Sequence, residues 1–195
     1  MLSYEESLKI LRETNALLEG HFVLSSGLHS NQYVQCAKLL SFPDKAEIVC
    51  QSLSEKIKDK FNKIDIVLSP AIGAIVVGYV IGKQLKTQTI FAERSNGKLL
   101  LRRGFDIPKN SNVLIVEDVI TTGKSALECS EIIKHFKSKL VGFACIIDRS
   151  NNDALIKQEI VSQIKIKIPL FKENELPDEL KKIPAIKPGS RNLNK

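Results

Sequence analysis

The chain has 195 residues, of which 43% are hydrophobic, and these numbers fit a single domain with a sizeable core. Its formal net charge of +7 indicates an anionic partner, a nucleic acid or a phosphorylated metabolite, although scattered lysines often form only a solvated surface. The four cysteines form no C-x-x-C pair and lie among apolar residues. This favours buried free thiols in a reducing cytosol over disulfides or a zinc site.

The sequence gives no indication of export or of a membrane span. The first fourteen residues carry three glutamates in an amphipathic pattern, which is untypical of a signal peptide. The longest uncharged run, 66–82, approaches the length of a transmembrane helix. However, Pro70, Gly73 and Gly78 divide it into a strand, a turn and the start of a helix. We therefore expect a cytoplasmic protein with no membrane partner.

Hydrophobic periodicity and turn residues predict alternating strands and helices from about residue 61 onward. Before that point we expect a helix over 4–18, short strands at 22–24 and 33–36, and a helix over 43–60. The later elements are strands at 64–68, 89–92, 113–116, 140–147 and 164–168, and helices over 73–85, over 123–137 and from Asn151 or Asn152 to about 162. Such alternation is typical of an α/β fold with a parallel central sheet flanked by helices.

We expect one domain over residues 1–195 with three parts. A small N-terminal hood spans about 1–40, and the α/β core spans about 61–170. The tail after the last predicted strand is rich in proline and lysine, and we expect it to pack loosely along the domain.

The segment from Glu93 to Asn112 interrupts the alternation of strands and helices. It contains the cations Arg94, Lys98, Arg102 and Arg103, two glycines and too little apolar periodicity for a helix. Long loops inside compact domains are often lids over a ligand. The cations therefore favour a flexible loop that closes over an anion, with an ordinary surface loop as the alternative.

The stretch from Val113 to Ala126 carries the most informative functional pattern. Four aliphatic residues lead into Glu117 and Asp118, and small hydroxylated residues around Gly123 follow. The order predicts a buried parallel strand, two acids at its carboxyl end and a phosphate cradle that opens a helix. Carboxylates accept hydrogen bonds from paired sugar hydroxyls, and the N–H groups of a glycine turn bind phosphate. The sequence therefore predicts a sugar-phosphate site.

Two other phosphate-binding motifs do not fit this stretch. Gly123-Lys124-Ser125 resembles the end of a Walker A loop, but the first glycine of that motif would stand at position 118, which is an aspartate, and no G-x-G-x-x-G is present. A second turn, 69–73, follows a predicted strand and precedes another helix. It would lie at the same edge of the sheet and offer more backbone N–H groups, so we expect a ligand with phosphates at two places.

Together these residues resemble the type I phosphoribosyltransferases, in which such a motif binds phosphoribosyl diphosphate (PRPP). Within that family the chain is similar to the orotate-specific members over nearly its whole length. The similarity includes the hood segment 22–33, the loop from Arg94 to Phe105, the pair Asp148-Arg149 and the tail segment 188–191. It implies transfer of the phosphoribosyl group from PRPP to orotate, giving orotidine 5′-monophosphate and pyrophosphate on the route to UMP.

The resemblance also assigns roles to residues. The acids would hold the ribose hydroxyls, 121–125 the 5-phosphate, and 69–73 the diphosphate with its magnesium. Thr121 and Arg149 would contact orotate, the arginine as a forked donor to the carboxylate. The expected PRPP-binding residues are Glu117, Asp118, Val119, Ile120, Thr121, Thr122, Gly123, Lys124, Ser125, Ala71, Ile72 and Gly73. Mg²⁺ is implied as a cofactor held mainly by PRPP and water, with no protein ligand, and a homodimer is implied as well.

The predicted loop departs from the family pattern. Better-known members carry a lysine followed by a histidine–glycine pair, whereas this chain has no histidine between Glu93 and Asn112. The cation that acts on the diphosphate is therefore one of Lys98, Arg94 and Arg102. We select Lys98, because arginine does not donate a proton usefully at neutral pH.

The three histidines lie elsewhere in the sequence. His29 stands in the hood turn, where it would contact ligand or serve a structural role. We expect His21 and His135 to be structural.

Two other functions stay open at this point. One is a phosphoribosyltransferase for another base, such as a purine, and the other is a PRPP-sensing regulator that binds nucleic acid. Arg149 favours orotate, because a base without a carboxylate would not need it. No separate basic module precedes or follows the predicted domain. We therefore expect PRPP and orotate as partners, and no nucleic acid.

Overall fold

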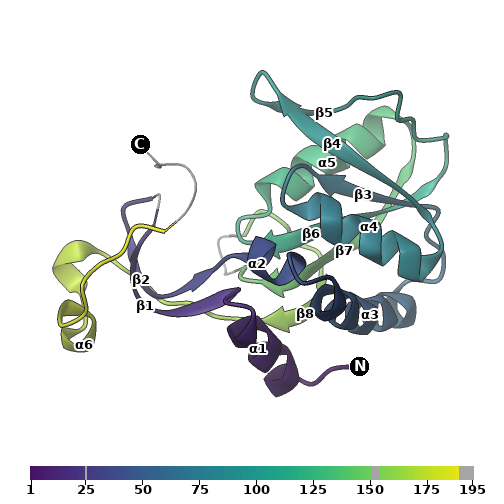
Figure 1. Cartoon of the computed structure of the whole chain (residues 1–195). Coiled ribbons are helices and arrows are strands. Elements are labelled where there is room, and N and C mark those ends of the chain that lie inside the picture. The colour runs from purple at the N-terminus through teal and green to yellow at the C-terminus, as the bar shows by residue number, and fades with distance from the viewer. Residues whose placement is uncertain (25, 151–153, 189–195) are drawn as a thin grey trace.

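In the computed structural model, which describes residues 1–24, 26–150 and 154–188, a large α/β core adjoins a smaller hood (Figure 1). The core is a sheet with strand order β5-β4-β3-β6-β7-β8, and its neighbouring strands are parallel except for the antiparallel β4–β5 pair. This arrangement confirms the predicted α/β fold. The strands are β3 (Ile66–Pro70), β4 (Gln88–Ser95), β5 (Lys98–Leu101), β6 (Asn112–Ile120), β7 (Lys139–Asp148) and β8 (Ile160–Lys165).

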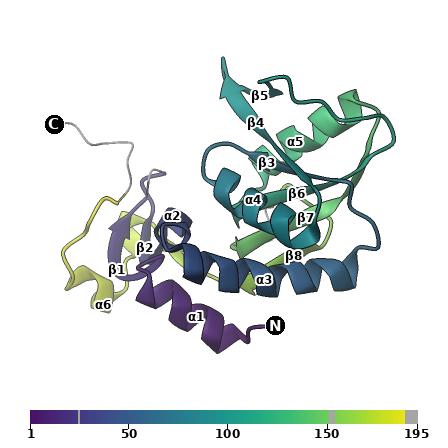
Figure 2. The same ribbon diagram turned by 45° about the vertical axis from the view of Figure 1, so that its right-hand side comes forward.

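Helices cover both faces of this sheet (Figure 2). On one face, α3 (Pro43–Lys60) and α4 (Ala74–Leu85) pack in a cluster that includes Leu114 of β6. On the other face, α5 (Lys124–His135) packs in a cluster that includes Ile115. Side chains alternate along a strand, so adjacent residues of β6 face opposite layers of helices. Within the described part of the chain, no helix is both long and apolar enough to cross a bilayer.

The N-terminal part begins with a helix that is shorter than predicted. α1 (Tyr4–Glu13) starts at a capping box in which the side chains of Ser3 and Glu6 bond each other's backbone N–H groups. It ends near Asn15, which adopts a left-handed φ of 55°. The next residues join β1 (Leu17–Val23), so the helix predicted over 4–18 is wrong at its C-terminal end.

The hood is a three-stranded sheet with strand order β1-β2-β9. β1 and β2 (His29–Val34) form an antiparallel hairpin. Two short strands were predicted here, but both observed strands begin and end earlier in the sequence than the predicted 22–24 and 33–36. β9 (Leu170–Phe171) comes from the C-terminal segment and pairs with the start of β2. The short helix α2 (Cys36–Leu40) then leads from the hood to α3.

The C-terminal segment packs on the hood, so the prediction of a loosely packed tail is wrong. Beyond β9 it forms a 3-10 turn (Glu173–Glu175) and α6 (Asp178–Lys181). Ile186 then donates a backbone hydrogen bond of 2.8 Å to His21 and accepts one of 2.8 Å from Val23. These pairings are non-local and leave little trace in sequence periodicity. The tail motif at 189–191 lies outside the described residues.

The helix predicted to end at about 162 is wrong. Residues 154–159, the described part of that range, are not helical, and β8 already begins at Ile160. The two expected caps, Asn151 and Asn152, lie outside the described residues. Ala154 and Ile156 are buried, so tertiary packing fixes an irregular conformation over the local helical preference.

The loop predicted over 93–112 begins as a β-hairpin. β4 continues to Ser95, and β5 returns antiparallel to it from Lys98. Asn96 and Gly97 form the turn with φ values of 49° and 80°, the positive angles that two-residue hairpin turns require. The Asn-Gly pair is a sequence signal for this turn, and the sequence reading missed it.

All four cysteines are buried and free, as predicted. Burial raises the pKa of the Cys50 thiol to about 12. It also raises the pKa values of the other three thiols, most strongly for Cys36 and Cys145. These cysteines are therefore protonated packing residues at neutral pH.

Candidate active site

The predicted phosphate cradle lies where β6 turns into α5. Gly123 has a φ of 78°, in the left-handed region that favours glycine. A Cβ at this position would lie 2.6 Å from two side-chain carbons of Ile156, so no larger residue fits without a shift. No side chain caps the start of α5. The N–H groups of its first turn and the positive end of the helix dipole are therefore suited to bind a phosphate.

The two acids lie within β6, which runs to Ile120 and not to 116 as predicted. Because they are adjacent in a strand, their side chains point to opposite faces of the sheet. The Ala126 N–H of α5 bonds the Glu117 carboxyl group. Asp118 faces the other layer, where its Oδ2 lies 3.0 Å from the place that a Cβ would take at Gly73. The acids therefore flank the strand end from two sides.

Burial perturbs both carboxyl groups. Desolvation, and to a lesser extent the charge of Asp118, raises the pKa of Glu117 to about 8. Burial also raises the pKa of Asp118. Neither acid takes part in the salt bridges of the described residues. A buried acid and a half-buried acid without a cation are suited to accept hydrogen bonds from sugar hydroxyls or from water around a metal ion.

The second predicted turn, 69–73, lies beside Asp118, because its last residue, Gly73, is the one that the Asp118 carboxyl group approaches. Ala71 donates a backbone hydrogen bond of 2.7 Å to Ala92, and the Ile72 side chain is 85% exposed. Ser69 Oγ is buried and has no hydrogen-bond partner among the described residues. The structure thus brings both predicted turns to the same edge of the sheet.

Arg149 stands at the end of β7 with unused donor capacity. Its backbone N–H donates to the Ile120 carbonyl at 2.8 Å, while its side-chain Nε is buried and has no partner in the described part of the chain. Burial lowers the pKa of its guanidinium group, and the hood residue Tyr33 lies close enough to affect it. The preceding Asp148 binds Lys165 at 3.1 Å. Arg149 is therefore suited to receive a carboxylate from a ligand.

The three candidate loop cations differ in their surroundings. Arg94 Nη1 lies 2.9 Å from Glu128 Oε2, an ion pair without hydrogen-bond geometry. Arg102 Nη1 lies 3.5 Å from Glu93 Oε2. Lys98 takes part in none of the salt bridges that the described residues form. Arg94 and Arg102 would each have to break an ion pair before binding a diphosphate. Lys98 would not.

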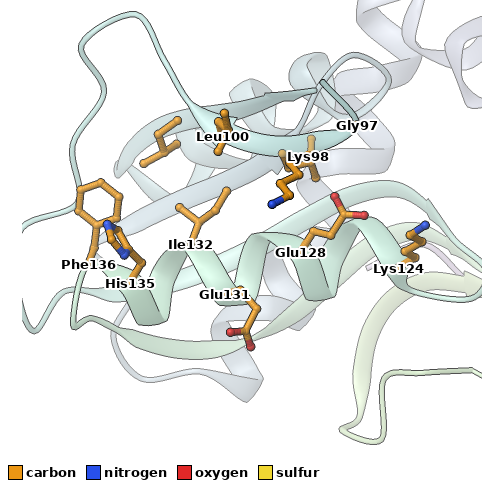
Figure 3. A pocket seen from close by; sticks show the side chains of 11 residues that line it. Gly97, Lys98, Leu100, Lys124, Glu128, Glu131, Ile132, His135 and Phe136 are labelled. Atoms are coloured by element: carbon orange, nitrogen blue, oxygen red, sulfur yellow. The ribbon is translucent and has the colours of Figure 1, made fainter. Parts of the chain in front are cut away.

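A cavity of about 700 Å³ separates β5 from α5 beside the cradle (Figure 3). Lys98, Lys124 and Glu128 lie toward one end of it, and His135 and Phe136 lie at the other. The hairpin cation Lys98 and the cradle residue Lys124 therefore border the same space. The two acids of β6 do not line this cavity.

The hood contains a buried histidine pair that sequence reading did not find. His21 Nε2 lies 2.7 Å from His29 Nδ1, and His21 Nδ1 lies 2.9 Å from the carbonyl oxygen of Ile183. Because a carbonyl only accepts, we assign the proton of His21 to Nδ1, so that its Nε2 accepts from His29. The pair joins both hood strands to the C-terminal segment, which gives His21 and His29 structural roles.

Acids at a strand end, a glycine-turn cradle and a second turn at the same sheet edge define a phosphoribosyltransferase type of site. The family model of the phosphoribosyl transferase domain matches residues 41–177. Orotate phosphoribosyltransferase of Caldicellulosiruptor saccharolyticus is 43% identical over 98% of this chain and 100% of its own length. The chain therefore belongs to the orotate phosphoribosyltransferase family.

Solved structures agree on the fold but do not select the base. Orotate phosphoribosyltransferase from Aeropyrum pernix matches with a TM-score of 0.69 at 23% identity, over 81% of this chain and 92% of that one. Adenine phosphoribosyltransferase from Thermoanaerobacter pseudethanolicus matches with a TM-score of 0.59 at 13% identity, over 69% of this chain and 88% of that one. One sheet architecture thus accommodates different bases, and the base must be argued from side chains.

Proposed function

We propose that this protein transfers the 5-phosphoribosyl group of PRPP to orotate, giving orotidine 5′-monophosphate and pyrophosphate in the biosynthesis of UMP. The observation that carries the choice of base is Arg149, a half-buried residue whose Nε atom is buried and has no hydrogen-bond partner among the described residues. A buried donor without a partner is costly, and a planar carboxylate is the ligand that the forked donors of arginine match. The full-length similarity to an orotate enzyme supports the same choice.

In this proposal each part of the site has one task. The 121–125 turn holds the 5-phosphate, and Glu117 and Asp118 bind the ribose hydroxyls. The bond from the anomeric carbon to the diphosphate oxygen breaks, a bond to the orotate nitrogen forms, and the proton of that nitrogen leaves with the pyrophosphate. In the transition state the ribose ring gains positive charge and the diphosphate gains negative charge. The carboxylates stabilise the first charge, and Lys98 of the hairpin stabilises the second.

The site suits a Mg²⁺ ion that takes most of its ligands from PRPP and water and few from the protein. Mg²⁺ keeps several waters and is usually bound through one or two carboxylates plus substrate phosphates. The site offers two carboxylates, and the described residues contain no cluster of three or more ligating side chains. We therefore assign the protein's share to Asp118, which faces the 69–73 turn. When bound, the ion would neutralise part of the diphosphate charge.

We also propose that two copies of the chain associate. Ile72, Val76 and Tyr79 lie along one side of α4 and its preceding turn and are 85%, 46% and 66% exposed. Val76 and Tyr79 are three residues apart and therefore share a side of α4, and Ile72 lies in the turn just before the helix. An exposed apolar patch of this kind is expected to be covered by a partner. Sedimentation equilibrium should give twice the mass of one chain, and the mass of a single chain would contradict this assignment.

The test of function is a comparison of bases with Mg²⁺ and PRPP, following release of pyrophosphate. Orotate should react faster than adenine, hypoxanthine and above all uracil, which has the same ring without the carboxylate. Arg149→Gln should lower kcat/KM for orotate by about 10²–10³-fold, because a charged hydrogen-bonding partner is lost. Arg12→Gln, which removes an exposed arginine paired with Glu19, is the matched control. Equal rates for orotate and the other bases would refute the proposal.

A further inference from the structure

A short segment outside the predicted motif packs against the phosphate cradle. The Leu155 N–H donates a hydrogen bond of 2.9 Å to the Thr122 carbonyl. The next side chain, Ile156, is 6% exposed and lies against the Cα of Gly123, where a Cβ would come within 2.6 Å of it. The side chain of Leu155 is 52% exposed. Two neighbouring aliphatic residues thus contact the cradle in different ways, Leu155 through its backbone N–H and Ile156 through its buried side chain.

The cradle turn has few contacts of its own to fix its shape. Within it, the Lys124 N–H lies 3.4 Å from Thr122 Oγ1, which is long for a hydrogen bond. Gly123 has no side chain to pack, and its backbone is the least restricted of any residue. A turn that must aim several N–H groups at one phosphate loses affinity if it has to be ordered during binding. Something outside the turn has to order it beforehand.

Ile156 is placed where it can order the cradle turn. It belongs to the buried cluster that includes Ala126 and Cys129 of α5 and Ile120 of β6. The side chain therefore bridges the strand that enters the turn and the helix that leaves it. Ile156 lies where a Cβ of Gly123 would point. Together with the Leu155–Thr122 hydrogen bond, it restrains Gly123 from that side.

We propose that Ile156 is a positioning residue of the phosphate cradle, holding the 121–124 turn in the geometry that binds the 5-phosphate of PRPP. The proposal rests on the proposed function for the identity of the phosphate. Ile156 acts through Gly123, with no direct contact to substrate. Since the 5-phosphate is held alike before and during reaction, loss of this restraint should raise KM for PRPP and leave kcat nearly unchanged.

The experiment compares Ile156→Ala with Leu155→Ala, which keeps the backbone N–H and removes an exposed side chain of similar size. Ile156→Ala should raise KM for PRPP and the Kd for ribose 5-phosphate by about tenfold, equivalent to about 1.4 kcal/mol. Its kcat should change by less than about threefold and its KM for orotate should stay unchanged, as expected for a purely ground-state effect on one substrate. Leu155→Ala should match the wild type in all four constants.

Ile156→Val keeps most of the buried volume and protects the test against loss of folding. It should give a PRPP KM between those of the wild type and Ile156→Ala, about two- to threefold above the wild type. A merely structural core residue would lower the melting temperature and leave the PRPP and ribose 5-phosphate constants unchanged. That result, or an equal rise in KM for both substrates, would overturn the positioning role.

Calorimetric titration with ribose 5-phosphate separates this proposal from the proposed function, because it involves neither a base nor turnover. If the wild type prefers another base, the proposed function is wrong. The ratio of the ribose 5-phosphate affinities of the wild type and Ile156→Ala still tests the role of Ile156 in that case. If orotate is the preferred base and that ratio stays near one, the positioning role alone fails.

Discussion

The proposed phosphate side and the proposed base side of the site are built in different ways. The phosphate side consists of two turns that follow β3 and β6, and within each turn the residues are close in sequence. The base side joins Arg149 of β7 to a hood that is complete only when the C-terminal segment adds β9 and the Ile186 bridges. One side therefore depends on local backbone geometry, and the other depends on contacts between the two ends of the chain.

This difference predicts that substitutions will separate the two substrates. A change in the cradle should affect PRPP and ribose 5-phosphate, and a change in the hood should affect orotate. The two sides are in contact: the Arg149 N–H donates to the Ile120 carbonyl, and Cys36 Sγ lies 3.7 Å from the Asp118 carbonyl oxygen. Variants that shift both substrates equally would argue against two separately built halves.

The largest effect on ribose 5-phosphate binding is expected for Gly123→Ala. Alanine at a φ of 78° is strained, and its Cβ would also collide with Ile156. We expect the Kd for ribose 5-phosphate to rise by about 100-fold, because the turn must move to relieve both problems. Gly97→Ala is the matched control, since Gly97 has a φ of 80° and nothing lies within 4 Å of its added Cβ.

Titration calorimetry on both variants would separate a local effect on the cradle from a general effect of a strained alanine. Gly97→Ala carries the same backbone strain but lies in the hairpin turn, so its ribose 5-phosphate affinity should equal that of the wild type. Similar affinities for the two variants would show that the cradle does not depend on the absence of a side chain at 123.

The phosphate side could be predicted from the sequence because its signals are local. A buried strand, two acids and a glycine turn follow one another, so the Gly123 turn and the 69–73 turn both lie where strand-end reasoning places them. The division of Glu117 and Asp118 between two faces was missed, because the strand was expected to end at 116. The pairing of β6 with β7 extends to Ile120. If the strand had been predicted to that length, the alternation of side chains along it would have placed the two acids on opposite faces.

The base side could be predicted only in part. Arg149 was expected at the end of a strand, where the structure has it, and two short strands were expected in the hood, but the tail that completes the hood was expected to pack loosely. The bond from His21 to Ile183 spans 162 positions, and single-sequence periodicity carries no information on such a pairing. The helix expected up to about 162 failed for the same reason, since the burial of Ile156 is decided by tertiary packing.

An intermediate effect is expected for His21→Phe, which keeps a ring in the hood but removes both hydrogen bonds of His21. The Ile183 carbonyl and His29 Nδ1 would lose their partner, and the restraint between the hood strands and the tail would weaken. We expect KM for orotate to rise by about tenfold, with no change in ribose 5-phosphate affinity. His135→Phe, at an exposed histidine on α5, is the control. A hood that matters only for stability would lower the melting temperature of His21→Phe without changing KM for orotate.

The smallest effect concerns the proton on Glu117, whose pKa burial raises from an ordinary 4.5 to about 8. Between these values the folded protein holds a proton that the unfolded chain has lost, so the free energy of unfolding should fall as pH rises through this window. Above about 8 the contribution is constant, because both states are ionised. Glu117→Gln should remove this slope, which denaturant titrations at pH 5.5, 7 and 8.5 would measure.

The proton on Glu117 should also weaken the binding of ribose 5-phosphate, and it should leave orotate binding unchanged. Only the ionised carboxylate accepts hydrogen bonds with both oxygens, so ribose 5-phosphate affinity should rise by about threefold from pH 7 to 9. Work above pH 7 avoids the second ionisation of the phosphate, which lies near pH 6. The affinity of Glu117→Gln should stay flat over this range. A wild-type affinity that is also flat would mean that Glu117 does not contact the ribose hydroxyls, leaving Asp118 on the opposite face as the acid that binds them.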